Sequence, residues 1–350
     1  MDKASTECFK IYANCIPVKG ARRSVICDLQ NNNYYHIPND LYDFIMLYDG
    51  KPYDEILKDF EEEAKPVINE YLQFMTDNEL AFFTTNPGSF TSLPLQWDEP
   101  SLITNAIIDN DRHSNHNWSQ IYDQLETVGC RDIQIRSYDE ISFSQLSFML
   151  DGLENRRIKS VELIVKFTDE INKRKLNSLV NRFPRIKNIF VHSSPKTEIF
   201  RFNDAEYLED SMGNIFFITQ SITDQTHCGQ ISPLLFTINV KTFTESQKFN
   251  SCLNRKVGID VSGAIKNCPS FDSNFGNINE VKLLEVVSRP DFQVKWHINK
   301  SSIETCQDCE YRHICTDCRA YTMNGKRHGK PAKCGYNPYA ASWEAIPQEQ

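Results

Sequence analysis

The run CQDCEYRHICTDCRAYT, residues 306–322, holds two Cys-x2-Cys pairs separated by five residues. Each pair places two thiolates on one side of a tight turn, at about the separation that a metal centre needs. Three more cysteines of the last hundred residues lie around this run, at Cys252, Cys268 and Cys334. Thiolates are soft donors that suit zinc and iron–sulfur clusters. The C-terminal region is therefore predicted to be a cysteine-ligated metal module.

The spacing alone leaves the metal open between zinc and iron. A zinc ribbon would use four of these seven cysteines and leave three without a role. Two four-iron clusters need eight ligands, and one further cysteine, Cys228, lies upstream. The count favours iron, with zinc as the alternative metal. Cys228 is equally open to interpretation as a buried thiol between a loop and a strand.

The bulk composition is that of an ordinary globular chain with room for two or three domains. The chain has 350 residues, of which 40% are hydrophobic and 24% charged, and its net charge is −9. No apolar run reaches the roughly 20 residues that cross a bilayer, and the start MDKASTEC lacks the features of a secretion signal. We therefore expect a cytoplasmic protein without a membrane partner, where clustered thiols are metal ligands more often than disulfides. The acidic charge argues against nucleic acid as a partner.

Residues 1–85 have the element order of a small winged-helix-like domain. Strands are expected at residues 9–18, 24–29 and 34–38, followed by helices beginning at Asn39, at 53–60 and at 64–78. From residue 102 strands and helices alternate. Strands are expected at 102–108, 132–137, 160–167, 186–192 and 215–219, and helices at 118–128, 143–153 and 169–183. This alternation predicts an α/β fold with a parallel sheet, at most a partial (β/α) barrel.

The cysteine pattern resembles the SPASM domain at the C-terminus of peptide-modifying radical SAM enzymes. The resemblance rests on Cys252-x10-Gly263-x4-Cys268, on the cysteines of residues 306–318 and on Cys334. The family usually has three residues between its last clustered pair, where this chain has two. The resemblance implies two auxiliary 4Fe-4S clusters. One would be held by Cys306, Cys309, Cys315 and Cys334, and the other by Cys252, Cys268 and Cys318, with Cys228 as the candidate for the remaining ligand.

The radical SAM motif Cys-x3-Cys-x2-Cys is absent from the sequence. In the family this motif follows the first barrel strand. Here the loop after residues 102–108 reads DNDRHSNHN and contains no cysteine. We interpret His113 and His116 in this loop as solvated side chains. Radical chemistry is not expected, and whether the chain is itself an enzyme stays open.

The whole layout resembles the SPASM-domain peptide maturases of grasp-with-spasm systems, which modify ribosomally made peptides (RiPPs). Residues 229–236, 250–269 and 306–322 carry this resemblance. It implies a leader-peptide recognition domain at 1–85, a partial radical-SAM-like (β/α) domain at 100–225 and an iron–sulfur SPASM domain at 226–350. The implied partners are a precursor peptide and an ATP-grasp ligase. The alternatives are a redox- or metal-dependent peptide-modifying enzyme in its own right and a zinc-binding peptide scaffold.

A leader peptide is expected to add as a strand to the edge at residues 34–37, above a groove floored by the third helix. The candidate peptide-binding residues are Tyr34, Tyr35, Ile37, Tyr71 and Phe74. For each of them, ordinary core packing is the alternative interpretation. The clusters could act in electron transfer or substrate ligation, but a structural role, in which metal binding contributes folding free energy, is favoured.

Overall fold

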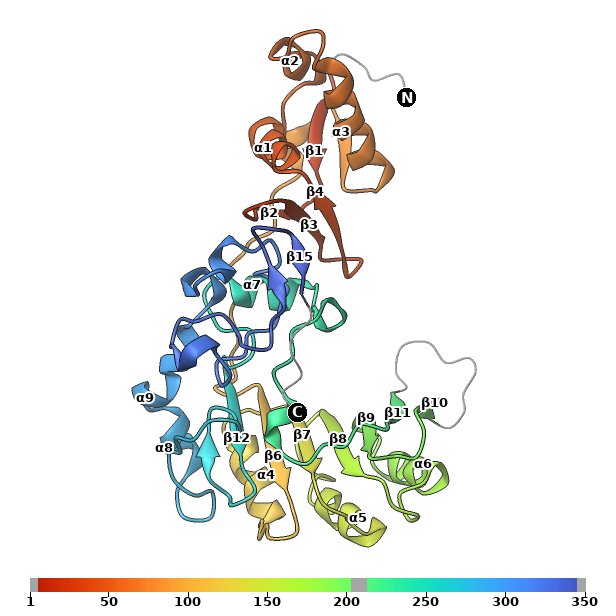
Figure 1. Ribbon diagram of the computed structural model, residues 1–350, viewed down its shortest axis with the longest axis vertical. Helices are drawn as coiled ribbons and strands as arrows, with labels where there is room; N and C mark the ends of the chain where they lie inside the picture. The colour runs from red at the N-terminus through yellow and green to blue at the C-terminus, as the bar shows by residue number, and fades with distance from the viewer. Residues whose placement is uncertain (1–5, 203–212, 345–350) are drawn as a thin grey trace. The chain divides into compact units, whose positions relative to one another are not determined.

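The chain passes between two compact units more than once. The computed structural model describes residues 6–202 and 213–344 (Figure 1). Unit 1 consists of Met1–Asp98, Ile231–Ser251 and Ile298–Gln350, and unit 2 of Glu99–Gln230 and Cys252–His297. The segment expected to form a single third domain, residues 226–350, is therefore divided between the two units.

Unit 1 begins with two small antiparallel sheets and three helices. The elements are β1 (Cys8–Ile11), β2 (Cys15–Val18), β3 (Ser24–Asp28), β4 (Asn33–Ile37), α1 (Asn39–Tyr48), α2 (Tyr53–Lys58), α3 (Lys65–Asp77) and β5 (Ala81–Thr84). The three helices and the strands β3 and β4 confirm the prediction. The single strand expected at 9–18 was wrong, because the chain turns between β1 and β2, and β1 pairs instead with β5, which the sequence reading missed.

All five residues of strand β3 are buried, and its three central residues, Val25, Ile26 and Cys27, are apolar, as expected for a strand covered on both faces. On one face Ile26 packs in a core with the inner sides of α1, α2 and α3. On the other face Val25 and Cys27 pack with Tyr311 and Ile314 from the C-terminal segment. The N-terminal elements and the C-terminal tail thus share a hydrophobic core within unit 1.

The rest of unit 1 has little regular structure. It contains η4 (Pro233–Leu235), α7 (Val240–Ser246), η6 (Lys300–Ser302), η7 (Cys306–Asp308), η8 (Met323–Gly325), β14 (Tyr336–Asn337) and β15 (Ser342–Trp343). Short 3-10 turns of this kind form few repeating backbone hydrogen bonds. Side-chain contacts and turns must therefore hold this tail in place.

Unit 2 is built on an eight-stranded sheet in the order β10-β11-β9-β8-β7-β6-β12-β13. Its strands are β6 (Asn105–Asn110), β7 (Asp132–Ser137), β8 (Ser160–Lys166), β9 (Ile186–His192), β10 (Glu198–Arg201), β11 (Asn214–Phe217), β12 (Lys256–Ile259) and β13 (Ile265–Lys266). The pairs from β12 to β11 are parallel, and β10 and β13 add antiparallel edges. The predicted α/β class and parallel sheet are confirmed.

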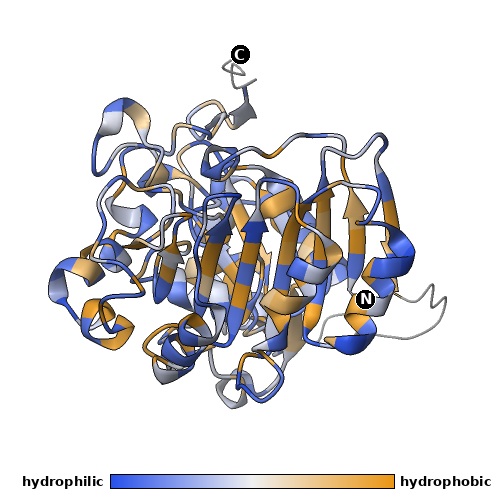
Figure 2. Ribbon diagram, turned by 90° about the horizontal axis from the view of Figure 1, so that it is seen from below, coloured by the Kyte–Doolittle hydropathy of each residue, from blue (hydrophilic) through white to orange (hydrophobic). Residues whose placement is uncertain are grey.

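The helices of unit 2 provide the apolar residues that cover this sheet. They are α4 (Trp118–Thr127), α5 (Phe143–Asp151), α6 (Lys173–Arg182), α8 (Leu283–Val287) and α9 (Pro290–Gln293), followed by η5 (Val294–His297). Strand β8 alternates buried and half-buried residues, as expected for a sheet whose one face packs on helices. Figure 2 shows the hydrophobic residues along these strands. No helix in the described parts of the chain is long and apolar enough to span a bilayer.

Two features of unit 2 depart from the prediction. The first parallel strand covers Asn105–Asn110 rather than residues 102–108, so Asp109 lies within the strand and not in a loop. Strands β12 and β13 come from the segment assigned to the C-terminal domain, and β12 pairs with β6. The parallel sheet therefore extends beyond the four or five strands expected from residues 100–225.

Candidate functional site

Cys306, Cys309, Cys315 and Cys334 form what we call the first thiol group, in unit 1. Two tight turns position the clustered cysteines, since the Cys309 N–H donates to the Cys306 carbonyl at 3.1 Å and the Cys315 N–H to the Tyr311 carbonyl at 3.0 Å. The thiols lie close enough to raise one another's pKa. The structure thus brings together the four cysteines expected to share one cluster.

Two members of the first thiol group are buried, whereas Cys309 and Cys334 are half-buried. Cys306 and Cys315 are each 7% exposed. Burial raises the pKa of Cys315 to about 12, and it raises the pKa of Cys306 and Cys309 as well. Because metals bind thiolates, a metal entering this site would release protons.

A buried set of charges lies beside the first thiol group. Lys300, Asp317 and Arg319 are 5%, 0% and 7% exposed. The Asp317 Oδ1 lies 2.7 Å from Arg319 Nη2 and 3.8 Å from Lys300 Nζ. Thiols Cys306 and Cys315 interact electrostatically with Lys300 and Asp317. Sequence reasoning missed these charges, although Asp317 stands inside the second Cys-x2-Cys pair.

Several buried polar atoms of this set have no hydrogen-bond partner among the described residues. They are Arg319 Nε and Nη2 and Asp317 Oδ1. Arg319 Nη2 and Asp317 Oδ1 are close enough for an ion pair, but the bond angles do not make an aligned hydrogen bond. Buried donors without acceptors are costly. Donors left open beside four thiols fit a group that supplies acceptor sulfurs, as an iron–sulfur cluster does.

The second thiol group, Cys228, Cys252 and Cys268, lies in unit 2. Cys228 follows η3 (Gln225–His227), Cys252 precedes β12, and Cys268 closely follows β13. All three interact electrostatically with Lys256, whose Nζ donates to Cys252 Sγ at 3.5 Å. Burial acts to lower the pKa of Lys256, but the three thiols raise it overall. Cys228 is exposed, so its interpretation as a buried thiol was wrong.

Cys318, which the resemblance assigns to the same cluster, is part of unit 1 rather than unit 2. Its membership of the second group stays a prediction. In residues 6–202 and 213–344, no three His, Cys, Asp or Glu side chains converge as ligands of a single metal ion. A four-iron cluster makes a different demand, because each cysteine binds a separate corner of the cube.

The loop that would carry a radical SAM motif begins at a closed, buried ion pair. Arg136 donates to both carboxylate oxygens of Asp109, at 2.6 and 2.9 Å, and the Tyr138 hydroxyl donates to the same carboxylate at 2.9 Å. Burial raises the pKa of Asp109, and the Arg136 guanidinium opposes that rise. Charged residues directly after apolar strand residues were the sequence signal for this site, which our reading missed.

The same loop folds back onto strand β6. His116 Nε2 lies 2.7 Å from the Asp109 carbonyl oxygen, and its ring packs edge-on against Trp118. The prediction that His116 is solvated was therefore wrong, whereas His113 is exposed as expected. Ser114 Oγ donates to the Val261 carbonyl at 2.8 Å. These contacts fasten the loop at both sides.

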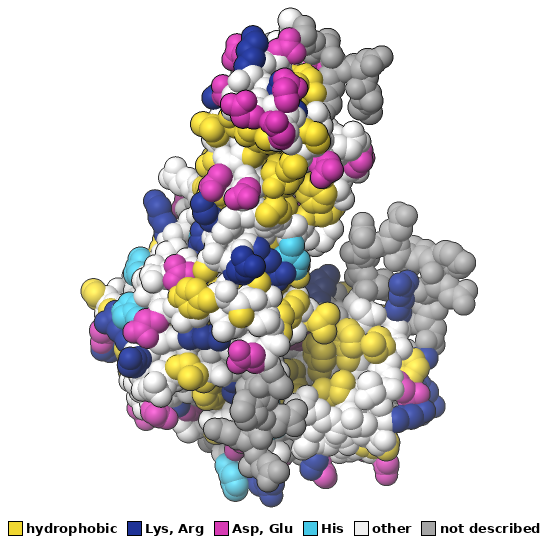
Figure 3. All heavy atoms as spheres, turned by 45° about the horizontal axis from the view of Figure 1, so that its top comes forward, with side chains coloured by type: hydrophobic (Ala, Val, Ile, Leu, Met, Phe, Trp, Pro, Cys, Tyr) yellow, Lys and Arg dark blue, Asp and Glu magenta, His cyan; other side chains and the backbone are white. Residues whose placement is uncertain are grey.

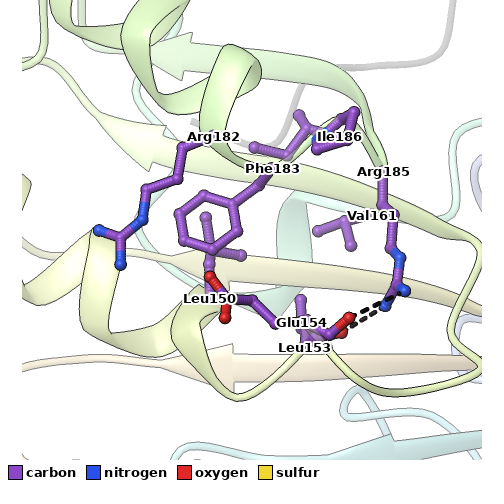
Figure 4. Close-up of a pocket in the computed structure, with 9 residues that line it drawn as sticks. Leu150, Leu153, Glu154, Val161, Arg182, Phe183, Arg185 and Ile186 are labelled. Atoms are coloured by element: carbon purple, nitrogen blue, oxygen red, sulfur yellow. Dashed lines mark hydrogen bonds between the residues drawn. The ribbon is translucent and has the colours of Figure 1, made fainter.

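A pocket of about 150 Å³ lies at the amino ends of the parallel strands, away from Asp109 and Arg136 at their carboxyl ends (Figure 4). Its lining includes Val161 and Ile186, which stand near the starts of β8 and β9. Ligands of open parallel sheets bind at the carboxyl ends of the strands, where Asp109 and Arg136 lie. Arg182 of the pocket already pairs with Asp151 at 2.7 Å. We assign no function to this pocket.

The residues expected to bind a peptide lie on two different faces of β4. Tyr35 faces α3, where its ring is 6.4 Å from that of Phe74, and Ile37 is 3% exposed in the same core. Tyr34 faces the tail, 5.5 Å from the ring of Tyr311. Within the described residues β4 pairs only with β3, so no strand is paired with its other edge. Three of the candidates, Tyr35 of β4 and the half-buried Tyr71 and Phe74 of α3, thus pack on the same core.

The surface of the N-terminal part carries hydrophobic side chains among acidic ones (Figure 3). Met46 and Leu47 of α1 and Val67 of α3 are exposed. These residues add apolar area to the helices that pack on the Tyr35 face of β4.

Comparison with known proteins gave distant likenesses. No family model matches the chain, and no curated protein matches it. Two solved structures show some similarity, both of a protein from Streptococcus suis. The crystal structure of SuiB bound to S-adenosylmethionine is 11% identical, with a TM-score of 0.33 over 89% of this chain and 96% of that chain. The structure of SuiB bound to precursor peptide SuiA has a TM-score of 0.32, with the same identity and coverage. Likeness at this level carries no argument about the function of this chain.

Proposed function

We propose that the chain is a peptide-maturation protein that binds a ribosomally made precursor peptide and carries two auxiliary 4Fe-4S clusters. The observation that carries this proposal is the gathering of seven cysteines into two groups, with Cys318 in addition, each group lying beside a buried or half-buried lysine. Neutral core thiols gain no stabilisation from a nearby lysine. A metal centre bound by thiolates carries negative charge, which a nearby lysine stabilises.

The first cluster, when bound, would supply cross-links between segments of the tail. Cys306, Cys309 and Cys315 come from one turn-rich stretch and Cys334 from a later one. Since this part of unit 1 has few regular elements, metal binding would contribute directly to its folding free energy. The protein side chains would position the cluster and shield it from water.

The structure at β6 supports a role without radical chemistry. Arg136 and Tyr138 donate hydrogen bonds to the Asp109 carboxylate. His116 and Ser114 hold the following loop in place by hydrogen bonds to backbone carbonyl groups. A non-radical chain fits a protein that presents peptide to another enzyme. On the layout resemblance, that enzyme is an ATP-grasp ligase.

The unpaired edge of β4 supports peptide binding by strand addition. Main-chain hydrogen bonds at such an edge provide affinity, and neighbouring side chains provide sequence specificity. Tyr35, Tyr71 and Phe74 would form the apolar floor beneath the added strand. Tyr34 would act differently, by holding β4 against the tail.

Metal analysis of anaerobically purified protein tests the cluster proposal. We expect ~8 irons and ~8 sulfides per chain, as two four-iron clusters require. One or two zincs per chain without sulfide would reject the iron–sulfur clusters and support the zinc-binding peptide scaffold instead. Peptide binding is tested separately, by fluorescence anisotropy with a labelled leader. Tyr71→Ala should weaken binding ~10-fold, the loss typical of an aromatic anchor. Tyr12→Ala should not, because Tyr12 is an exposed residue directly after β1.

A second candidate function, a metal-dependent enzyme in its own right, is favoured by one observation. Cys228 is exposed and interacts electrostatically with Arg136, so the second thiol group lies near the carboxyl edge of the parallel sheet. A cluster there would be within reach of a substrate at that edge. Anaerobic incubation with precursor peptide, S-adenosylmethionine and a reductant distinguishes the two. A change in peptide mass without the ligase would reject the purely supporting role.

A further inference from the structure

Each thiol group has a lysine of its own that is not used elsewhere in a surface ion pair. Lys300 is buried and interacts with Cys306, Cys315 and Cys334. Lys256 is half-buried and donates to Cys252. Within the described parts of the chain, Lys256 makes no ion pair with a carboxylate. Lys300 begins η6 in unit 1 and Lys256 begins β12 in unit 2, so the same arrangement occurs in two separate parts of the fold.

The three charges of the buried set formed by Lys300, Asp317 and Arg319 do not cancel. Lys300 and Arg319 are two buried cations, and Asp317 is the single carboxylate between them. The difference is one positive charge, and all three side chains are buried. Asn250 takes up the other oxygen of Asp317, donating to Oδ2 at 2.8 Å, and so fixes the carboxylate without changing this balance.

An excess cation in a buried site is costly unless an anion faces it. Protonated thiols offer no such anion. An oxidised four-iron cube bound by four thiolates is a dianion, and reduction adds a further negative charge. The cluster of the proposed function would therefore meet the excess charge, and its sulfurs would accept from the open Nε and Nη2 groups of Arg319.

We propose that Lys300 and Lys256 are the counter-charges of the two clusters, each stabilising the reduced state of its own cluster, and that Asp317 and Arg319 hold Lys300 in place. This inference rests on the proposed function. It predicts that the two lysines act separately. Removal of one positive charge within several ångströms of a cluster should disfavour that cluster's reduction by roughly ten- to a hundredfold in the equilibrium constant.

The experiment compares anaerobically purified wild type with Lys300→Met, Lys256→Met and the charge-conserving Lys300→Arg. Lys326→Met is the matched control, because Lys326 lies in the same tail but its side chain is 60% exposed. For each protein we would measure iron and sulfide per chain and then follow the reduced-cluster signals by electron paramagnetic resonance during a redox titration. Circular dichroism would report whether each variant is folded.

We expect Lys300→Met to move one cluster to lower potential and Lys256→Met to move the other, while Lys326→Met moves neither. If Lys300→Met loses iron instead and Lys300→Arg restores it, the counter-charge role is equally supported. Loaded Lys300→Met protein with wild-type potentials would overturn the inference. So would a folded Lys300→Arg variant that cannot hold iron. A wild type without iron would reject the proposed function itself, which is a different result from either.

Discussion

Arg23 and Glu310 are 287 residues apart in the sequence, yet Arg23 Nε donates to Glu310 Oε1 at 2.9 Å. Arg23 immediately precedes β3, and Glu310 follows Cys309 of the first thiol group. Tyr336 also donates to Glu310, and Arg23 Nη2 donates to the Tyr311 hydroxyl at 2.8 Å. This network joins the N-terminal sheet to the cysteine-bearing tail inside unit 1.

Loss of Arg23 should destabilise unit 1. Glu310 is fully buried, so Arg23→Met would leave its carboxylate without its cation. Because Arg23 itself is 28% exposed, water would compensate in part, and we expect a loss of about 2–3 kcal/mol in the free energy of unfolding. Urea denaturation of the anaerobic protein measures it. Lys19→Met, which breaks an exposed pair with Asp43, serves as control, and equal effects of the two variants would contradict the prediction.

The Asp109–Arg136 pair should be essential for the stability of unit 2. Asp109→Asn would leave the buried Arg136 unpaired, and breaking such a pair costs about 3–5 kcal/mol. Hydrogen exchange should show faster opening of β6 and β7. Asp139→Asn breaks the neighbouring pair with the largely exposed Arg112 and should change little. Unchanged exchange in Asp109→Asn would show that the pair does not support the sheet.

Stability should fall as the pH drops below about 6.5, and His192 should account for part of the loss. Burial lowers the pKa of His192 in the folded chain. Its Nδ1 accepts from the Ile222 N–H at 3.3 Å while Nε2 lies 3.2 Å from the Ser137 carbonyl, an arrangement that requires a neutral ring.

Below the unfolded-state pKa of ~6.5 the unfolded chain takes up a proton that the folded chain does not. The stabilisation is therefore present above that pH and is lost as the pH falls, by at most ~1.4 kcal/mol per unit. Urea denaturation of wild type and His192→Gln at pH 5.5 and 7.5 tests this. A variant that loses as much stability as wild type would show that His192 does not contribute.

Cys228 should be needed for one cluster only. Cys228→Ser removes a thiol from the second group and leaves the first group intact, so iron per chain should fall from ~8 toward ~4. Cys130→Ala is the control, since Cys130 is a buried thiol in the core of unit 2. Full iron content in Cys228→Ser would assign the remaining ligand to another residue.

The sequence by itself predicted what depends on short-range patterns. The three helices of the N-terminal part and the strand–helix alternation of unit 2 follow from apolar spacing within single elements. The turn at Cys306-Cys309 follows from local spacing as well. The radical SAM motif is also a short local pattern, so its absence follows from the sequence without the structure.

The tertiary structure decided everything that depends on contacts between distant segments. Pairing of β1 with β5 and of β12 with β6 joins residues that no local period relates. The two faces of β4 separate Tyr34 from Tyr35, because neighbouring strand residues point in opposite directions and only the surroundings show what each one meets. Lys256 and Lys300 looked like ordinary lysines in the sequence. Their position beside the thiols is a property of the folded chain, because only folding brings these distant residues together and weakens the screening by water between them.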